Sequence, residues 1–255
     1  IHTMGGCLLS DNLSWSSVMF AFNSLPPDPQ LRGQDWRSIW HQRLEANAPW
    51  LMEWLEHPQR DDYWRHGSVC EDYAAIRCPV LAVSGWADGY TNAVFRLLAN
   101  LEVPCQGIVG PWSHRYPHLG EPGPAIGFQS LVTDWWDRWL KGERNGVDEA
   151  PRLRAWIQDA DPPATAYGER PGRWVAEAHW PTPAVQVRTL HPHGDGSLAQ
   201  TPANDSAGRL RLDSPLGLGL FAGKWCSYAD GPDLPDDQRK EMSGGLVFET
   251  EPLEA

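Results

Sequence analysis

The fold of this chain is decided by Cys78-Pro79-Val80-Leu81-Ala82-Val83-Ser84, followed at once by Gly85-Trp86-Ala87-Asp88-Gly89-Tyr90. A short continuous apolar run that ends at a glycine is typical of a strand buried in a parallel sheet. Helical spacing of apolar residues follows over residues 91–101, and residues 105–110 offer a second short strand. The order strand, helix, strand predicts a βαβ unit with a parallel sheet, and therefore an α/β fold.

Two loops follow these predicted strands and carry the candidate catalytic residues. Asp88 lies in the first loop, and His114 ends the second loop, Gly110-Pro111-Trp112-Ser113-His114. Because the carboxyl ends of parallel strands open on one edge of a sheet, the carboxylate and the imidazole can meet there. Asp88 would then accept a hydrogen bond from one ring nitrogen of His114 and leave the other nitrogen free to act as a base.

The order of these two residues fits the downstream part of a hydrolase triad. In α/β-hydrolases the triad runs Ser, Asp or Glu, then His along the chain. Each residue also has a plain structural interpretation, since Asp-Gly is a common turn dipeptide and a loop histidine often satisfies a local hydrogen bond. Their placement after consecutive strands favours the catalytic interpretation over two separate turn residues.

Helices are predicted on both sides of this unit. Residues 10–68 resemble a small helical subdomain, in which we expect Asp35 to cap one helix and Asn47 to cap a second with Pro49 in its first turn. Residues 124–141 read as an amphipathic helix closed by Gly142.

The chain changes character after residue 151. Short strand-like runs alternate with turns rich in Gly, Pro and Asp, as at residues 153–157, 186–190 and 246–250. This pattern is typical of a β-sandwich.

The composition of the chain restricts the kinds of molecule that it is expected to bind. The 255 residues are 41% hydrophobic and 21% charged, with a formal net charge of -12 and no run of Lys or Arg. The chain is therefore expected to be globular and not to bind nucleic acid or an anionic membrane surface. No apolar run reaches the ~20 residues that a membrane span needs. Small molecules are the expected partners, and a homo-oligomer stays open.

Cysteines and histidines outside the two loops offer weaker signals. The five Cys include no Cys-x-x-Cys pair, which favours reduced thiols and, on that ground alone, the cytoplasm. Cys7 is an alternative nucleophile, but it lacks a nucleophile elbow. His191 and His193 with Asp195 suggest zinc ligands, yet they lie in a Pro/Gly turn without a further ligand. We expect a solvated loop there, with no metal and no cofactor.

Several motifs in order resemble the CocE/NonD hydrolases, the family of cocaine esterase and the X-Pro dipeptidyl peptidases. The resemblance covers most of residues 62–255, while residues 1–61 agree only loosely, chiefly at Gly5-Gly6. The motifs are Asp62-Tyr63-Trp64, Ile76-Arg77-Cys78-Pro79-Val80-Leu81, Gly85-Trp86-Ala87-Asp88-Gly89-Tyr90, Gly110-Pro111-Trp112-Ser113-His114, Trp135-Trp136-Asp137-Arg138-Trp139-Leu140-Lys141-Gly142, Gly223-Lys224-Trp225, Asp237-Gln238-Arg239 and Leu246-Val247-Phe248-Glu249-Thr250-Glu251-Pro252-Leu253.

The resemblance implies a domain layout. Residues 1–68 would form a helical cap with the tail of the preceding core segment, and residues 69–148 the C-terminal part of an α/β-hydrolase core. Residues 149–255 would form an all-β jelly-roll domain of the galactose-binding type, truncated at its end.

The resemblance also implies that Asp88 and His114 are the triad Asp and His of a serine-type hydrolase of esters or amides. The nucleophilic Ser would belong to a Gly-x-Ser-x-Gly elbow, and no Ser of this sequence lies in one. We therefore expect the chain to be a C-terminal fragment that lacks its nucleophile and is inactive alone.

Substrate contacts can also be placed by resemblance. Relatives that bind an α-amino group have an acidic cluster just after the triad Asp, whereas here Gly89-Tyr90-Thr91 follows Asp88. An uncharged acyl group is therefore expected, with Tyr90 lining its pocket and Trp86 and Trp112 as further candidates. The rival hypothesis is a noncatalytic protein that binds a carbohydrate or similar ligand through its Trp-rich β-sandwich, since jelly rolls also serve as lectins.

Overall fold

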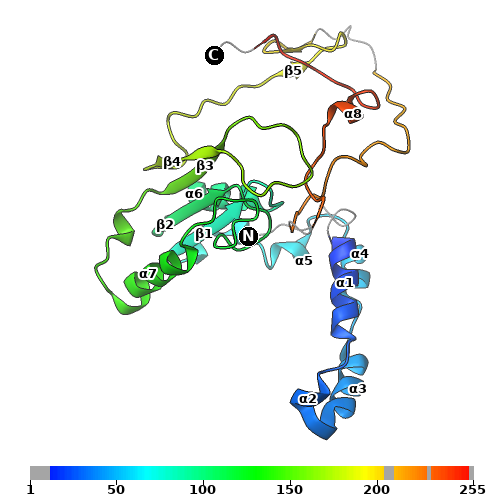
Figure 1. Ribbon diagram of the computed structural model, residues 1–255, viewed down its shortest axis with the longest axis vertical. Helices are drawn as coiled ribbons and strands as arrows, with labels where there is room; N and C mark the ends of the chain where they lie inside the picture. The colour runs from blue at the N-terminus through cyan, green and yellow to red at the C-terminus, as the bar shows by residue number, and fades with distance from the viewer. Residues whose placement is uncertain (1–11, 204–209, 229–230, 253–255) are drawn as a thin grey trace. The chain divides into compact units, whose positions relative to one another are not determined.

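The computed structural model describes residues 12–203, 210–228 and 231–252 (Figure 1). It divides into two compact units, Ile1–Ile76 and Arg77–Ala255, which we call unit 1 and unit 2. Within the described residues, no helix is both long enough and apolar enough to cross a membrane. Cys7, the alternative nucleophile, and Gly5-Gly6 lie outside the described residues.

The regular structure in the described part of unit 1 is all helical, as the sequence predicts for residues 10–68. Its elements are α1 (Leu13–Asn23), α2 (Pro29–Arg32), η3 (Gly33–Asp35), α3 (Trp36–Ala46), α4 (Trp50–Glu56), α5 (Asp62–Arg65), η4 (Val69–Glu71) and η5 (Tyr73–Ala75).

The two helix caps predicted in unit 1 are wrong. Asp35 precedes α3 but makes no side-chain cap, because it already closes the turn of η3 in a helical conformation. Asn47 ends α3 instead of starting α4, and its amide nitrogen donates to the carbonyl of Phe20 at 3.2 Å. Residue 49 is the N-cap of α4, one position before the first turn in which Pro49 was expected.

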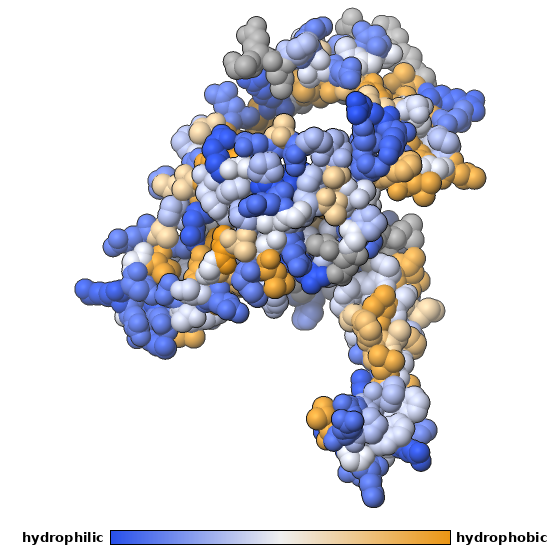
Figure 2. All heavy atoms as spheres, in the orientation of Figure 1, coloured by the Kyte–Doolittle hydropathy of each residue, from blue (hydrophilic) through white to orange (hydrophobic). Residues whose placement is uncertain are grey.

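Stacked indoles hold α1 against α4. The ring of Trp15 lies 6.1 Å from those of both Trp50 and Trp54. Apolar side chains nevertheless remain on the surface of these helices, among them Val18 and Phe22, which are 47% and 56% exposed (Figure 2).

Unit 2 is built on a four-stranded sheet with the order β1-β2-β3-β4. The predicted βαβ unit is confirmed: β1 (Val80–Gly85) pairs in parallel with β2 (Cys105–Gly110), and α6 (Thr91–Asn100) connects them. β1 lies at the edge of the sheet as described. Both strands therefore direct their carboxyl ends to the same side, where Asp88 and His114 follow.

The core of unit 2 lies between α6 and the sheet. Leu98 and Ile108 are each 1% exposed, and Val94 is 3% exposed. Gly107 permits this packing, because a Cβ atom there would lie 2.6 Å from Cδ1 of Leu98. The guanidinium of Arg152 donates to the carbonyls of Leu98 and Leu101 at 2.7 and 2.8 Å, so a cation ends α6 where the helix dipole favours one.

The predicted amphipathic helix is present as α7 (Phe128–Lys141), and it begins four residues later than residue 124. Gly142 ends it in the left-handed conformation, with φ of 77°, as the sequence predicts. The indole of Trp135 is the buried anchor of α7, with 2% of its surface exposed.

The next two strands join the same sheet. β3 (Leu153–Gln158) pairs in parallel with β2, and β4 (Gly172–Glu177) pairs antiparallel with β3. The sequence assigns residues 153–157 to the β-sandwich and predicts a domain boundary at residue 148, which stays a prediction. In the structure β3, which follows that boundary, pairs with β2, which precedes it. The alternating pattern of β3 does not distinguish an added strand of one sheet from the first strand of a second.

The remaining described residues contain little regular structure. β5 (His191–Pro192) pairs with β6 (Leu198–Ala199), Ser197 forms a bridge with Glu249, and α8 spans Arg239–Met242. Residues 186–190 do not form the predicted strand, and Val187 is 92% exposed. The predicted strand at 246–250 contributes only the bridge at Glu249. The jelly roll therefore stays a prediction.

Candidate active site

The loops after β1 and β2 lie directly against each other. The backbone N–H of Trp86 donates to the carbonyl of Gly110 at 2.9 Å, and that of Ala87 donates to the carbonyl of Trp112 at 3.1 Å. Gly85 makes this approach feasible, because a Cβ atom at that position would overlap the carbonyl of Trp112. Two backbone hydrogen bonds, together with the absence of a Cβ atom at Gly85, thus allow the two loops to lie in contact.

Asp88 and His114 form a hydrogen-bonded pair at this junction. His114 Nδ1 lies 3.0 Å from Asp88 Oδ2. The other carboxylate oxygen, Oδ1, accepts the backbone N–H of Tyr90 at 2.9 Å, which fixes the carboxylate plane. The Asp88 side chain is 10% exposed and the His114 side chain 41% exposed. A largely buried carboxylate therefore orients a ring that remains accessible.

The arrangement specifies which ring nitrogen can act. A carboxylate only accepts hydrogen bonds, so Nδ1 of His114 is the donor to Asp88, and in the neutral ring Nε2 then carries the lone pair. This is the orientation that a general base needs, with its carboxylate partner behind it.

A cavity of about 750 Å³ opens in front of the pair. Its wall is mostly apolar or aromatic, with Asp88, His114 and Arg115 as its acidic and basic side chains. The lining residues are Val83, Ser84, Asp88, Trp112, Ser113, His114, Arg115, Tyr116, Pro117, Leu119, Phe128 and Tyr228. A pocket of this size and character can bind a small organic molecule.

Two of the predicted substrate-binding residues lie beside the pair. The Tyr90 ring is 5.7 Å from that of His114, although Tyr90 does not line the cavity. Trp112 lines it but is 1% exposed, and its indole N–H donates to the carbonyl of Pro124 at 2.9 Å. Trp112 is thus a packed wall of the site, and the substrate roles of both residues stay predictions.

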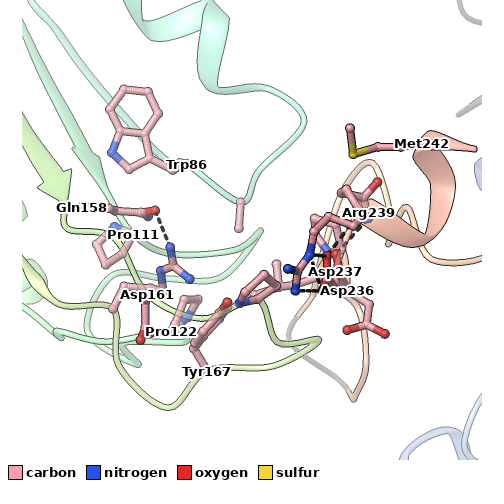
Figure 3. Close-up of a pocket in the computed structure, with 16 residues that line it drawn as sticks. Trp86, Pro111, Pro122, Gln158, Asp161, Tyr167, Asp236, Asp237, Arg239 and Met242 are labelled. Carbon is pink, nitrogen blue, oxygen red and sulfur yellow. Dashed lines mark hydrogen bonds and ion pairs between the residues drawn. The ribbon is translucent and has the colours of Figure 1, made fainter. Parts of the chain in front are cut away.

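Trp86, the third predicted contact, lies at a different cavity (Figure 3). Its indole N–H donates to the carbonyl of Trp156 at 2.5 Å, and its ring stacks on Phe95. The cavity has a volume of about 650 Å³, and its lining residues include Trp86, Tyr167 and Arg170 but neither Asp88 nor His114. Trp86 therefore lines a different cavity from the Asp88–His114 pair, and its substrate role stays a prediction.

Asp88, His114 and Cys226 together offer three atoms of the kind that bind zinc. These donor atoms lie within 4.8 Å of one another, and they form the one such group among the described residues. The Asp88 and His114 atoms already bind each other, however. At the predicted solvated loop, Asp195 Oδ1 accepts the N–H of Ser197 at 2.9 Å, and His193 Nε2 lies 2.9 Å from the carbonyl of Thr201.

Sequence reasoning missed one part of the site, residues 226–228. Cys226 Sγ lies 4.0 Å from Asp88 Oδ1, and the Tyr228 ring lies 5.1 Å from the His114 ring, edge to face. The motif Gly223-Lys224-Trp225 immediately precedes them, but in the sequence it indicates only the resemblance to the family. No local pattern relates residues more than a hundred positions apart, so their contact with the pair had no signal.

Two family profiles match consecutive parts of the chain. The X-Pro dipeptidyl-peptidase (S15 family) matches residues 1–116, and the X-Pro dipeptidyl-peptidase C-terminal non-catalytic domain matches residues 145–255. The first match ends two residues after His114, so it contains both members of the pair.

Individual proteins are also similar to parts of the chain. The chain is 24% identical to the cocaine esterase of Rhodococcus sp. (strain MB1 Bresler) over 228 residues, which is 80% of this chain and 38% of that protein. Two crystal structures of a CocE/NonD family hydrolase from Staphylococcus aureus align with 16% identity and TM-scores of 0.44 and 0.45. Each alignment covers 65% of this chain, and 29% and 28% of the respective structures. The chain thus spans less than half the length of these relatives.

Proposed function

Because this chain belongs to the CocE/NonD hydrolase family, we propose that it is part of a serine-type hydrolase that cleaves esters or amides through an acyl-enzyme. One observation carries the proposal: Asp88 Oδ2 and His114 Nδ1 lie 3.0 Å apart after adjacent parallel strands, facing a cavity of about 750 Å³. The order Asp before His along the chain also matches the triad of α/β-hydrolases.

In this mechanism His114 moves the proton in both halves of the reaction. Nε2 takes the proton from the nucleophilic hydroxyl as it attacks the carbonyl carbon, and then gives it to the leaving alcohol or amine. In the second half the same nitrogen takes a proton from the water that attacks the acyl carbon. It returns this proton to the serine oxygen as the acyl–oxygen bond breaks and the acid is released. Asp88 holds the Nδ1–H tautomer and stabilises the imidazolium that forms at each step. No cofactor is needed for this chemistry.

We propose that the nucleophilic Ser and the oxyanion donors come from chain beyond these 255 residues. No Gly-x-Ser-x-Gly sequence is present here. Among the described strands, β1 has a neighbour on one side only, which leaves an edge where a further strand can pair. The buried hydroxyl of Ser84 lines the cavity and has no hydrogen-bond partner in the described part of the chain.

The acyl group that the site would accept is uncharged. Support comes from the apolar and aromatic wall, which includes Tyr116, Leu119 and Phe128. The loop after Asp88 continues with Gly89-Tyr90-Thr91 and offers no acidic group for a substrate ammonium. Tyr90 would border this acyl site.

The test is serine-directed labelling of the complete gene product. A phosphonate probe and a chromogenic ester are applied to the wild type, His114→Ala and Asp88→Asn. We expect labelling and turnover to fall by about 10³-fold or more in His114→Ala and by up to about 10⁴-fold in Asp88→Asn, because the base or its tautomer is lost. Equal labelling and ester turnover in all three proteins would overturn the assignment of Asp88 and His114 to a triad. The noncatalytic, ligand-binding hypothesis instead predicts neither labelling nor turnover in any of them.

A further inference from the structure

A segment from the C-terminal part of unit 2, residues 223–228, lies on the loop that carries Asp88. The ring of Trp225 packs edge to face on Tyr90, with 5.1 Å between ring centroids. A Cβ atom at Gly89 would lie 2.6 Å from the Trp225 ring, so the glycine allows the indole to rest on the backbone beside Asp88.

The same segment also contacts the loop that carries His114. The backbone N–H of His114 donates to the carbonyl of Ser227 at 2.7 Å, and Nε of Arg115 donates to the carbonyl of Tyr228 at 2.6 Å. Ser227 is 1% exposed. Residues 223–228 therefore hold the backbone on which the imidazole is mounted, while Tyr228 flanks the ring itself.

Asp233 in turn holds residues 223–228. Its side chain is 2% exposed, and Oδ1 lies 2.6 Å from Nζ of Lys224. Oδ2 of Asp233 accepts the backbone N–H of Tyr228 at 3.1 Å. The backbone carbonyl of Asp233 accepts the backbone N–H of Lys224 at 2.7 Å. A buried carboxylate is costly unless it is paired and hydrogen-bonded, so these bonds strongly favour one conformation of the segment.

We propose that Asp233 is a positioning residue that acts through residues 223–228 to fix His114 against Asp88. The proposal rests on the proposed function and extends it, because it gives the region matched by the non-catalytic domain a role in catalysis. The contacts of the Asp233 side chain described above are with Lys224 and Tyr228. Through Lys224 and Tyr228 it holds residues 223–228, whose Ser227 carbonyl binds the His114 backbone and whose Tyr228 ring flanks the imidazole. The imidazole is itself 41% exposed. A displacement of about 1 Å at a catalytic group can lower the rate by about 10²-fold.

The experiment compares steady-state ester hydrolysis by variants of the complete gene product. We expect Asp233→Ala to lower kcat by roughly 10- to 100-fold with KM within about twofold, since positioning affects the transition state more than substrate binding. Lys224→Met should lower kcat less, and Lys224→Arg should retain it because the cation is kept. Asp213→Ala is the matched control: that carboxylate is exposed, pairs with Arg211, and should leave kcat unchanged.

The outcomes separate this inference from the proposed function. If His114→Ala abolishes turnover while folded Asp233→Ala retains wild-type kcat, the positioning role is wrong and the proposed function stands. If His114→Ala is as active as the wild type, the proposed function itself fails. Should Asp233→Ala not fold, Lys224→Met decides, because its side chain is 63% exposed: wild-type kcat in that variant contradicts the inference.

Discussion

Residues 80–142 and residues 178–252 belong to the same unit but differ in how their structure is held. In the first, strand pairing and a buried interface between α6 and β2 leave Leu98 and Ile108 only 1% exposed. In the second, two two-residue strands and one bridge are the described β-structure, and Leu216 is fully exposed. The catalytic pair follows the strands of the first region, whereas the second reaches the pair through residues 223–228. Packing of the core thus fixes the strands that carry the catalytic pair, whereas a few hydrogen bonds and one ion pair fix residues 223–228 beside it.

The largest expected effect is the difference in the free energy of unfolding between two Leu→Ala variants, one in each region. Leu98→Ala should destabilise the chain by about 2–5 kcal/mol, because it opens a cavity at a buried position. Leu216→Ala, at an exposed position, should change the free energy of unfolding by no more than about 0.5 kcal/mol. Denaturant unfolding of both variants measures the difference. Equal effects would mean that the two regions are equally packed.

The stronger region is also the one that the sequence predicts. The apolar runs at 78–84 and 105–110 and the helical spacing between them follow from burial on both faces of a parallel sheet, so composition and period suffice. The prediction of a strand at 186–190 is wrong, because alternating residues form a strand only where a neighbouring strand supplies hydrogen bonds. Asp88 and His114 could be located from strand order, since topology alone brings them together. Cys226, Tyr228 and Asp233 could not, because their approach depends on long-range contacts of irregular chain.

The second prediction concerns the contact between the two loops of the site. Gly85→Ala places a methyl group against the carbonyl of Trp112 and should cost about 1–3 kcal/mol while separating Asp88 from His114. Phosphonate labelling of the complete gene product should fall accordingly. Gly168→Ala is the control, because its added Cβ meets nothing within 4 Å. Undiminished labelling of Gly85→Ala would show that the pair does not depend on this close approach.

A third prediction compares backbone protection. Amides of β1 and β2 should exchange with solvent most slowly, because their hydrogen bonds open only with the core. Those of residues 210–222 should exchange quickly, with the amides of Lys224 and Tyr228 intermediate because Asp233 holds them. Hydrogen exchange resolved by peptide tests this order. Slow exchange throughout residues 210–228 would contradict the contrast between the regions.

The smallest expected effect concerns the reactivity of two cysteine thiols, Cys78 and Cys105. Burial raises the pKa of the Cys105 thiol in β2, although nearby Arg152 opposes the shift, whereas Cys78 is exposed. Because the folded state keeps the Cys105 proton to higher pH than the unfolded state, this group lowers stability as pH rises through the ordinary thiol pKa. Alkylation near pH 8 should therefore modify Cys78 well before Cys105. Comparable rates at both would indicate that β2 opens readily.

The pair itself is tested most directly by the protonation state of the His114 ring, measured by nitrogen NMR of the 255-residue chain at a pH where the ring is neutral. We predict that Nδ1 carries the proton and Nε2 does not, and that Asp88→Asn removes this preference. A neutral ring protonated at Nε2 in the wild type, or a tautomer unchanged in Asp88→Asn, would contradict the assignment of Asp88 as the group that orients the base.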